Sequence, residues 1–199
     1  EPVEQEAQIR LMEKLQNHSG NDSVRVLRPA DNHAVKECWR MAMENQQTPT
    51  ALIFSRQLVK TLPAGTDYSQ ATKGAYSVID TPTPDVILIA SGSEVSTLVE
   101  TAYKLQADGY KVRVVSCPSE GLFRKQSKAY QEQVLPYGVK KFGLTAGLSV
   151  TLAGLVGEHG RIHSLESFGY SAPFPVLDEK LGFTPDNIYK EVVEFLQEA

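Results

Sequence analysis

The feature that most constrains the fold of this chain is a strand–helix–strand pattern within residues 86–116. Residues 86–90 form an uninterrupted apolar run, which is typical of a strand buried on both faces of a parallel sheet. A helical pattern follows and ends at Gly109, and a second strand is predicted at residues 111–116. A strand, a crossover helix and another strand predict a mainly parallel sheet with right-handed connections.

The same alternation continues toward the C-terminus. The pattern predicts a helix ended by Leu135-Pro136, a strand at 142–145, a short helix at 149–156 and a strand at 161–165. It then predicts a helix that stops at Gly182 and a last helix capped by Thr184, with Pro185 at its first position. A strand at residues 74–79 starts this set. Residues 74–199 are therefore long enough for a complete α/β domain.

The first 62 residues carry the pattern of an incomplete domain. The predicted elements are a helix at 2–15, a strand at 24–27, a helix capped by Asp31, and a buried strand at 51–54. The apolar stripes of the helices predict that Leu11 and Leu15 in the first, and Trp39 and Met43 in the second, face a core. Two strands are too few for a stable sheet. We therefore expect residues 1–62 to be an incomplete α/β segment, which the turn-rich residues 63–73 link to the domain at 74–199.

Composition argues against several classes of protein. The 199 residues are 41% apolar and 22% charged, and the formal net charge is −4. That charge argues against a nucleic-acid partner, and no apolar stretch approaches membrane-spanning length. Cys38 and Cys117 fall in apolar segments, so we expect reduced core thiols and a cytoplasmic location. The chain opens with polar residues and no initiator Met, so we expect no signal peptide and a start inside a longer polypeptide.

The strongest candidate binding residue is Arg56, within Ser55-Arg56-Gln57. It follows the predicted strand at 51–54, and ligands of open α/β sheets bind beyond the carboxyl ends of strands. A guanidinium is always charged, and its fork matches two phosphate oxygens. One interpretation is an anion clamp, in particular for a sugar phosphate. The other is an ordinary ion pair with a neighbouring carboxylate.

Other chemically active residues give weaker patterns. Ser91-Gly92-Ser93-Glu94 lies at a helix start, where N–H groups bind anions, but it lacks the glycine spacing of nucleotide fingerprints, and a plain tight turn is favoured. His159 and His163 are four residues apart, but Gly160 breaks the helical geometry that a shared metal would need. Cys117 has apolar neighbours that favour an inert thiol. The residue chemistry alone indicates no catalytic machinery.

Several motifs occur in a fixed order along the chain. They are Glu1-Pro2-Val3-Glu4, Arg28-Pro29-Ala30-Asp31, Ser55-Arg56-Gln57, Lys73-Gly74-Ala75-Tyr76, Ser91-Gly92-Ser93-Glu94-Val95, Val114-Val115-Ser116-Cys117-Pro118-Ser119, Ser167-Phe168-Gly169-Tyr170-Ser171-Ala172-Pro173 and Leu181-Gly182-Phe183-Thr184. Each motif alone is weak. Their order and spacing together resemble the C-terminal third of a bacterial transketolase, over essentially the whole chain.

The resemblance implies a fold, an activity and partners. Residues 1–62 would be the end of the pyrimidine-binding domain, and residues 74–199 the transketolase C-terminal domain, which is mixed α/β with one antiparallel strand. The full-length enzyme transfers a two-carbon ketol unit from a ketose phosphate to an aldose phosphate, using thiamine diphosphate and a divalent cation, Mg or Ca. The implied partners are the remainder of the polypeptide, a second copy in a homodimer, and sugar phosphate substrates.

Only part of that machinery falls within this chain. Ser55-Arg56-Gln57 matches the family motif whose Arg binds the substrate phosphate, so the resemblance gives Arg56 this role. The family's Gly-Asp-Gly motif for the metal and diphosphate is absent, and its pyrimidine-activating Glu and substrate-contacting His would precede Glu1. We therefore expect no catalytic residue, bound cofactor or metal in this chain, and no activity from it alone.

Two alternatives stay open at the level of sequence. One is a stand-alone regulatory or anion-binding module, built on the turn at Ser91-Gly92-Ser93. The other is part of a related thiamine diphosphate enzyme, such as a deoxyxylulose phosphate synthase or a dehydrogenase β subunit. The pairing of Ser-Arg-Gln with Phe-Gly-x-Ser-Ala-Pro favours transketolase.

Overall fold

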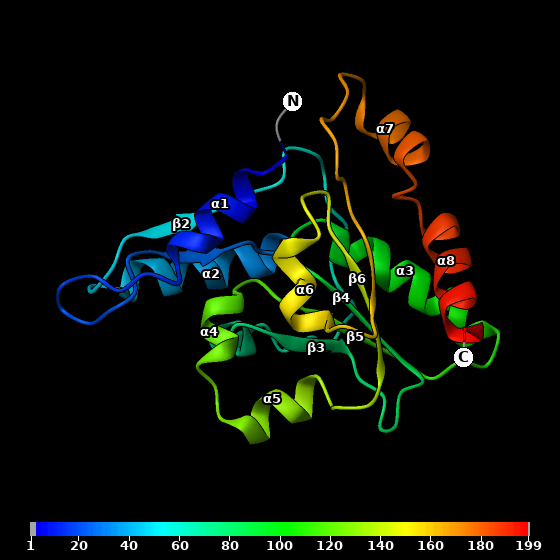
Figure 1. Cartoon of the computed structure of the whole chain (residues 1–199), viewed down its shortest axis with the longest axis horizontal. Helices are drawn as coiled ribbons and strands as arrows, with labels where there is room; N and C mark the ends of the chain where they lie inside the picture. The colour runs from blue at the N-terminus through cyan, green and yellow to red at the C-terminus, as the bar shows by residue number, and fades with distance from the viewer. Residues whose placement is uncertain (1–2, 199) are drawn as a thin grey trace.

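The computed structural model describes residues 3–198, which form a five-stranded sheet and a separate two-stranded sheet (Figure 1). The strands are β1 (Arg25–Leu27), β2 (Thr50–Leu52), β3 (Tyr76–Ile79), β4 (Val86–Ala90), β5 (Val112–Ser116), β6 (Lys140–Leu144) and β7 (Arg161–His163). The helices are α1 (Gln5–Met12), α2 (Asn32–Glu44), the 3-10 helix η1 (Tyr68–Lys73), α3 (Glu94–Ala107), α4 (Glu120–Arg124), α5 (Lys128–Val134), α6 (Val150–Val156), α7 (Phe174–Leu181) and α8 (Pro185–Gln197).

The larger sheet has the strand order β3-β5-β4-β6-β7. Strand β3 pairs antiparallel with β5, and the other neighbouring strands pair in parallel. The prediction of a mixed, mainly parallel sheet with flanking helices is therefore confirmed.

Strand β4 lies at the centre of this sheet and is buried on both faces. Val86, Leu88 and Ala90 pack in one cluster with α3 and α8, which lie side by side in Figure 1. Ile87 and Ile89 pack on the opposite face with side chains of α4, α5 and α6. Because successive strand residues point to opposite faces, a strand covered on both sides needs the continuous apolar run found here.

Local sequence signals begin and end several helices as predicted. The Asp31 carboxylate accepts a hydrogen bond from the Ala34 N–H at 2.8 Å and caps α2. Thr184 caps α8 in the same way, with Pro185 at the first helical position. Gly182 ends α7 with φ of +81°, a left-handed conformation that glycine adopts without strain.

The helix predicted between Ser119 and Leu135 is in fact two helices, α4 and α5. Ser127 separates them, because its hydroxyl accepts a hydrogen bond from the Tyr130 N–H at 3.2 Å and begins a new helix. A serine hydroxyl that bonds to a nearby backbone group competes with helix continuation. No helix within residues 3–198 has both the length and the apolar content needed to cross a bilayer.

The smaller sheet consists of β1 and β2 in parallel, with Val26 opposite Ala51. Leu27 and the α2 residues Cys38 and Met41 share a small core with residues of η1 and β3. The segment predicted as a linker is thus folded onto α2. The Leu62 N–H at its start and the Tyr68 hydroxyl within it both donate hydrogen bonds to the Asp31 carboxylate, at 2.9 and 2.7 Å.

The predicted apolar stripes of the two N-terminal helices are only partly buried: Ala7 and Cys38 lie in the core, but the larger side chains do not. Helix α1 ends at Met12, Leu11 and Leu15 are exposed, and the buried residues of the helix are Ala7 and Arg10; Pro2 lies outside the described residues. On α2, Trp39 and Met43 are exposed at 49% and 75% of their surface. The periodicity identified an apolar side of each helix, but the described residues provide nothing that covers all of it.

The predicted strand at 51–54 is also different in the structure. Strand β2 covers only Thr50–Leu52 and is half-buried throughout, and Phe54 is 46% exposed. An apolar run predicts a buried strand only where a second layer covers its outer face. Strand β2 pairs with β1 alone in the described part of the chain, so that condition is not met.

Candidate functional site

Arg56 lies four residues beyond Leu52, where β2 ends. Because β1 and β2 are parallel, the segments that follow them leave the same edge of the small sheet. The Arg56 side chain is exposed, and it forms no hydrogen bond or ion pair with any residue between 3 and 198. Within residues 3–198, the structure therefore does not contain the ion pair with a neighbouring carboxylate that the alternative interpretation requires. The guanidinium is available for an external anion.

An open cavity of about 480 Å³ adjoins the Arg56 segment. Its lining includes Ser55 and Gln57 on either side of Arg56, and the rings of Trp39 and Phe54, whose centroids are 6.2 Å apart. Trp39 and Phe54 thus lie outside the core and form part of the wall of this cavity, beside the segment that carries Arg56.

A second arginine, Arg28, leaves the same sheet edge, and the sequence prediction missed its role. It directly follows β1, so the strand-end argument that identified Arg56 applies to it equally. Its Nη2 donates to both carboxylate oxygens of Glu94 at 2.9 Å. Its Nη1 donates to the Ser91 carbonyl oxygen at 2.8 Å. This arginine, whose side chain is only 12% exposed, therefore joins the N-terminal region to the first turn of α3.

Two further charges complete the cluster around Arg28. The Glu6 carboxylate lies 3.5 Å from the Arg28 Nε and 2.8 Å from Arg10. Burial raises the pKa of Glu6, but Arg28 and Arg10 together outweigh burial and hold it below its usual value. Burial lowers the pKa of Arg28, whereas Glu94 and Glu6 raise it to a net value above the ordinary one. The four charges compensate one another, as buried charges must.

Glu94 also occupies the edge of the large sheet where ligands of α/β proteins usually bind. The chain passes from β4 to β5 on one side and places β6 on the other, so the strand order reverses around β4. At the carboxyl ends of β4 and β6, the Glu94 Oε1 accepts a hydrogen bond from the Ala146 N–H at 2.9 Å. A carboxylate of the protein thus takes the place that an external anion would need.

The turn at residues 91–93 is correspondingly closed. A Cβ atom on Gly92 would lie 2.6 Å from the Arg28 Cζ, so the guanidinium fills the space above the turn. The structure therefore favours the tight-turn interpretation over an anion site. Among residues 3–198, no group of three or more His, Cys, Asp and Glu side chains is arranged to hold a metal ion. This turn therefore has no room for a diphosphate, and no such cluster is present to hold its cation in the described part of the chain.

The remaining candidates are part of the structural framework. The His163 ring packs on Phe183 with centroids 4.7 Å apart, and its Nδ1 lies 3.0 Å from Glu191. His159 is exposed and apart from it on the loop before β7. Cys38 and Cys117 are free, buried thiols, and burial raises the pKa of each to about 12. Both cysteines are the inert core residues that the sequence predicts.

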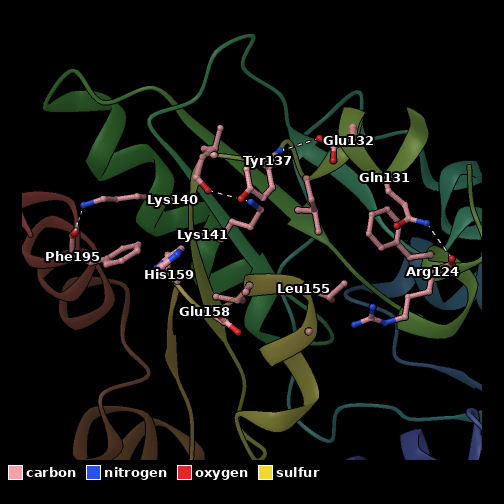
Figure 2. A pocket seen from close by; sticks show the side chains of 18 of the residues that line it. Arg124, Gln131, Glu132, Tyr137, Lys140, Lys141, Leu155, Glu158, His159 and Phe195 are labelled. Atoms are coloured by element: carbon pink, nitrogen blue, oxygen red, sulfur yellow. Dashed lines mark hydrogen bonds between the residues drawn. The ribbon is translucent and has the colours of Figure 1, made fainter. Parts of the chain in front are cut away.

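A cavity of about 630 Å³, to whose lining the Arg56 segment does not contribute, lies beside the start of β6 and the end of α8 (Figure 2). Its two lysines are already engaged. Lys140 Nζ donates to the Phe195 carbonyl oxygen at 3.0 Å, and Lys141 Nζ donates to the Pro136 carbonyl oxygen at 2.9 Å. Burial lowers the pKa of Lys141. These lysines bind the ends of neighbouring segments, so the size of this cavity does not make it the candidate site.

Comparison with known proteins defines the class to which this chain belongs. Residues 74–184 match the family model described as "Transketolase-like TK C-terminal domain". The chain is 40% identical over 194 residues to a probable transketolase of Streptococcus pneumoniae, a match that covers 96% of this chain and 28% of that protein. It is 37% identical over 197 residues to a Staphylococcus aureus transketolase, covering 97% of this chain and 28% of the relative.

The solved structures agree with the sequence relatives. Transketolase from Leishmania mexicana superposes with a TM-score of 0.87 at 32% identity, over 99% of this chain and 27% of that one. The chain thus has the fold of the C-terminal part of these enzymes. It belongs to the transketolase family, and it spans about 28% of the length of the curated relatives. The matches do not favour either alternative, the stand-alone module or another thiamine diphosphate enzyme.

Proposed function

We propose that this chain is the C-terminal part of a transketolase polypeptide, and that Arg56 binds the phosphate group of its sugar substrates. The proposal rests on the 40% identity across 96% of the chain, a region that includes the Ser55-Arg56-Gln57 motif. The exposure of Arg56 at a strand end supports the same role. A guanidinium there can bind two phosphate oxygens at once and hold the far end of the substrate.

The complete enzyme would transfer a two-carbon ketol unit from a ketose phosphate to an aldose phosphate. Thiamine diphosphate, with a divalent cation, supplies the carbanion chemistry when it is bound. Since Arg28 fills the turn at residues 91–93 and residues 3–198 contain no cluster suited to the cation, we propose that the remainder of the polypeptide holds that group. The contribution of this chain is then to bind and orient the phosphate, which fixes the position of the reacting carbonyl at the other end of the sugar.

The domain organisation follows from the same proposal. Residues 1–62 would be the end of the pyrimidine-binding domain, residues 63–73 the link, and residues 74–199 the C-terminal domain. The family match begins at residue 74, and each region has its own sheet. The remainder of the polypeptide would cover the exposed apolar side chains of the first region. These are Leu11, Met12, Leu15, Trp39, Met43, Phe54 and Leu58. A homodimeric, cytoplasmic enzyme is part of this proposal, on the resemblance to the family.

The test is Arg56→Ala in the complete transketolase polypeptide. Charge-assisted hydrogen bonds contribute about 1.5–3 kcal/mol each, so we expect the KM for sugar phosphates to rise roughly 10- to 100-fold. The kcat should change less, because phosphate binding is the same in the ground state and the transition state. Arg40→Ala is the matched control, since Arg40 is exposed and pairs with Glu37 and Glu44 on its own helix. An unchanged KM for sugar phosphates in Arg56→Ala would contradict the proposal.

A second measurement tests the incomplete character of the chain. The purified 199-residue chain should show no transketolase turnover with thiamine diphosphate and Mg²⁺ added. Turnover by pure material would mean that the chain holds the cofactor by itself.

A further inference from the structure

We propose that Gln57 and Ser93 are positioning residues for Arg56, through which the five-stranded domain sets how tightly the substrate phosphate is held. This inference rests on the phosphate-binding role proposed above. In this proposal the C-terminal domain affects substrate recognition through Ser93, which does not contact the substrate itself.

The segment that carries Arg56 has few anchors. It runs without regular secondary structure from Ile53, whose N–H donates to the Leu27 carbonyl oxygen at 2.9 Å, to the buried Leu62. Between these ends, the hydrogen bonds and ion pairs with other described residues are Gln57 to Ser93 and Lys60 to Glu100. The Lys60 side chain is 76% exposed, and exposed ion pairs contribute little. Gln57, adjacent to Arg56, is therefore the polar anchor nearest to it, alongside the ring contact of Phe54 with Trp39.

Ser93 joins Gln57 to the buried ion pair. Gln57 Nε2 donates to the Ser93 Oγ at 3.3 Å, and the Ser93 Oγ donates to the Glu94 Oε2 at 3.2 Å. A hydroxyl has one proton, so a Ser93 that donates to Glu94 presents only its lone pairs to Gln57. The Glu94 carboxylate is itself fixed by Arg28 and by the Ala146 N–H. Glu94 therefore fixes the Ser93 hydroxyl, and Ser93 in turn fixes the side chain of Gln57, which is adjacent to Arg56.

The Ser93 hydroxyl has no competing role in the helix that it precedes. Ser93 is the N-cap residue of α3, but its side chain makes no capping hydrogen bond. Its side chain and that of Gln57 instead line a cavity of about 500 Å³ between the Arg56 segment and the large domain. Removing the hydroxyl therefore breaks the connection to Gln57 without removing a helix cap.

The experiment compares two donor substrates with Ser93→Ala in the complete enzyme. One is a ketose phosphate, and the other is a ketose of the same length without the phosphate. Ser93→Ala removes the neutral hydrogen bond from Gln57 and also the hydrogen bond from Ser93 to Glu94. The first of these connects to the Arg56 segment, so we expect the KM for the ketose phosphate to rise roughly 2- to 10-fold. The KM for the unphosphorylated ketose and the kcat should not change. Gln57→Leu removes only the neutral hydrogen bond, so it should give the same pattern with an unchanged melting temperature.

Ser96→Ala is the matched control. Ser96 lies on the same helix and lines the same cavity, but its hydroxyl donates to the Ser93 carbonyl oxygen at 2.9 Å and does not reach Gln57. We expect both KM values to be unchanged in this variant. In an Arg56→Ala background, Ser93→Ala should have no further effect on phosphate discrimination, because the residue that it positions is gone.

The outcomes separate the two proposals. If Arg56→Ala abolishes phosphate discrimination and Ser93→Ala leaves it intact, the positioning role is overturned and the phosphate role stands. If Arg56→Ala itself leaves discrimination intact, both are overturned. If Ser93→Ala impairs both substrates equally, or Gln57→Leu lowers the melting temperature, the role of this contact is structural and the positioning proposal is overturned.

Discussion

Strands β4 and β2 begin from similar apolar sequences but end in different surroundings. The side chains of Val86–Ala90 have no exposed surface, whereas those of Thr50–Leu52 are all half-buried. The five-stranded sheet has helices on both faces, so its central strand buries both sets of side chains. The two-stranded sheet has no such second layer within residues 3–198. An apolar run predicts a strand that can be buried on both faces. Whether it is buried depends on the helices or strands that pack against those faces.

The two regions also meet by an unusual kind of contact. Arg28, from the end of β1, reaches the carboxyl edge of the large sheet and pairs with Glu94 there. Glu6, Arg10, Arg28 and Glu94 form a cluster of largely buried charges, and its Arg28–Glu94 pair lies where an α/β domain of this topology would normally admit a ligand. The edge of the large sheet where a ligand would normally bind therefore contacts the smaller region instead. Arg28 pairs with Glu94 there, and Gln57 of the Arg56 segment bonds to Ser93.

Arg28→Met, measured by urea unfolding of the chain, tests whether the charge cluster holds the two regions together. Removing Arg28 leaves the buried Glu94 carboxylate without a cationic partner, while Glu6 keeps Arg10, so we expect a loss of about 3–5 kcal/mol in the free energy of unfolding. Arg40→Met, which breaks only exposed ion pairs, should show no measurable loss. A loss below about 1 kcal/mol for Arg28→Met would mean that the cluster does not hold the two regions together.

The difference in apolar burial is tested by one truncation in each region. Leu88→Ala removes a fully buried side chain of β4, and we expect it to lower the free energy of unfolding by about 2–5 kcal/mol. Trp39→Ala removes a larger but half-exposed side chain, and the change in this chain should stay within about 0.5 kcal/mol. In the complete enzyme, we expect the cost of Trp39→Ala to increase, because the remainder of the polypeptide would cover that surface. Equal costs for Leu88→Ala and Trp39→Ala in the isolated chain would contradict the comparison.

The smallest expected effect is on the pH dependence of stability. Because the folded-state pKa of Glu6 lies below its ordinary value of 4.5, the charged carboxylate stabilises the fold above pH 4.5. That contribution is lost as the pH falls through the folded-state pKa. Glu6→Gln should therefore flatten the decline of the unfolding free energy as the pH falls below 4.5. Glu158→Gln, at an exposed position, should leave the decline unchanged, and a Glu6→Gln profile parallel to that of the unaltered chain would refute this assignment.

Much of the fold was predictable because its signals are local. Asp31, Thr184 and Pro185 begin helices through contacts within three residues, so their effect does not depend on the rest of the chain. The run at residues 86–90 predicted a strand buried on both faces, and the parallel pairing of β4 with β5 and β6 confirmed it. The break at Ser127 was also local, but Ser127 looks like any surface serine until its hydroxyl is seen to cap α5.

The candidate site was only partly predictable. Arg56 followed from its place after a strand and from the family resemblance, and its phosphate-binding role stays a prediction. Arg28 carried the same strand-end signal, yet its partner Glu94 lies 66 residues away in the sequence. No spacing rule identifies such a pair, and the connection from Glu94 through Ser93 to Gln57 depends on it.

Local sequence patterns were enough to predict the caps of α2 and α8, most of the order of strands and helices and the α/β class, because these depend on backbone geometry and hydrophobic periodicity over a few residues. Long-range contacts determine which of two similar arginines is largely buried and which is exposed, and they leave Trp39 at the surface. A charge is costly to bury without a partner. Arg28 can be buried only because folding brings Glu94 and Glu6 to it from distant segments, whereas Arg56 meets no carboxylate within residues 3–198 and stays in solvent.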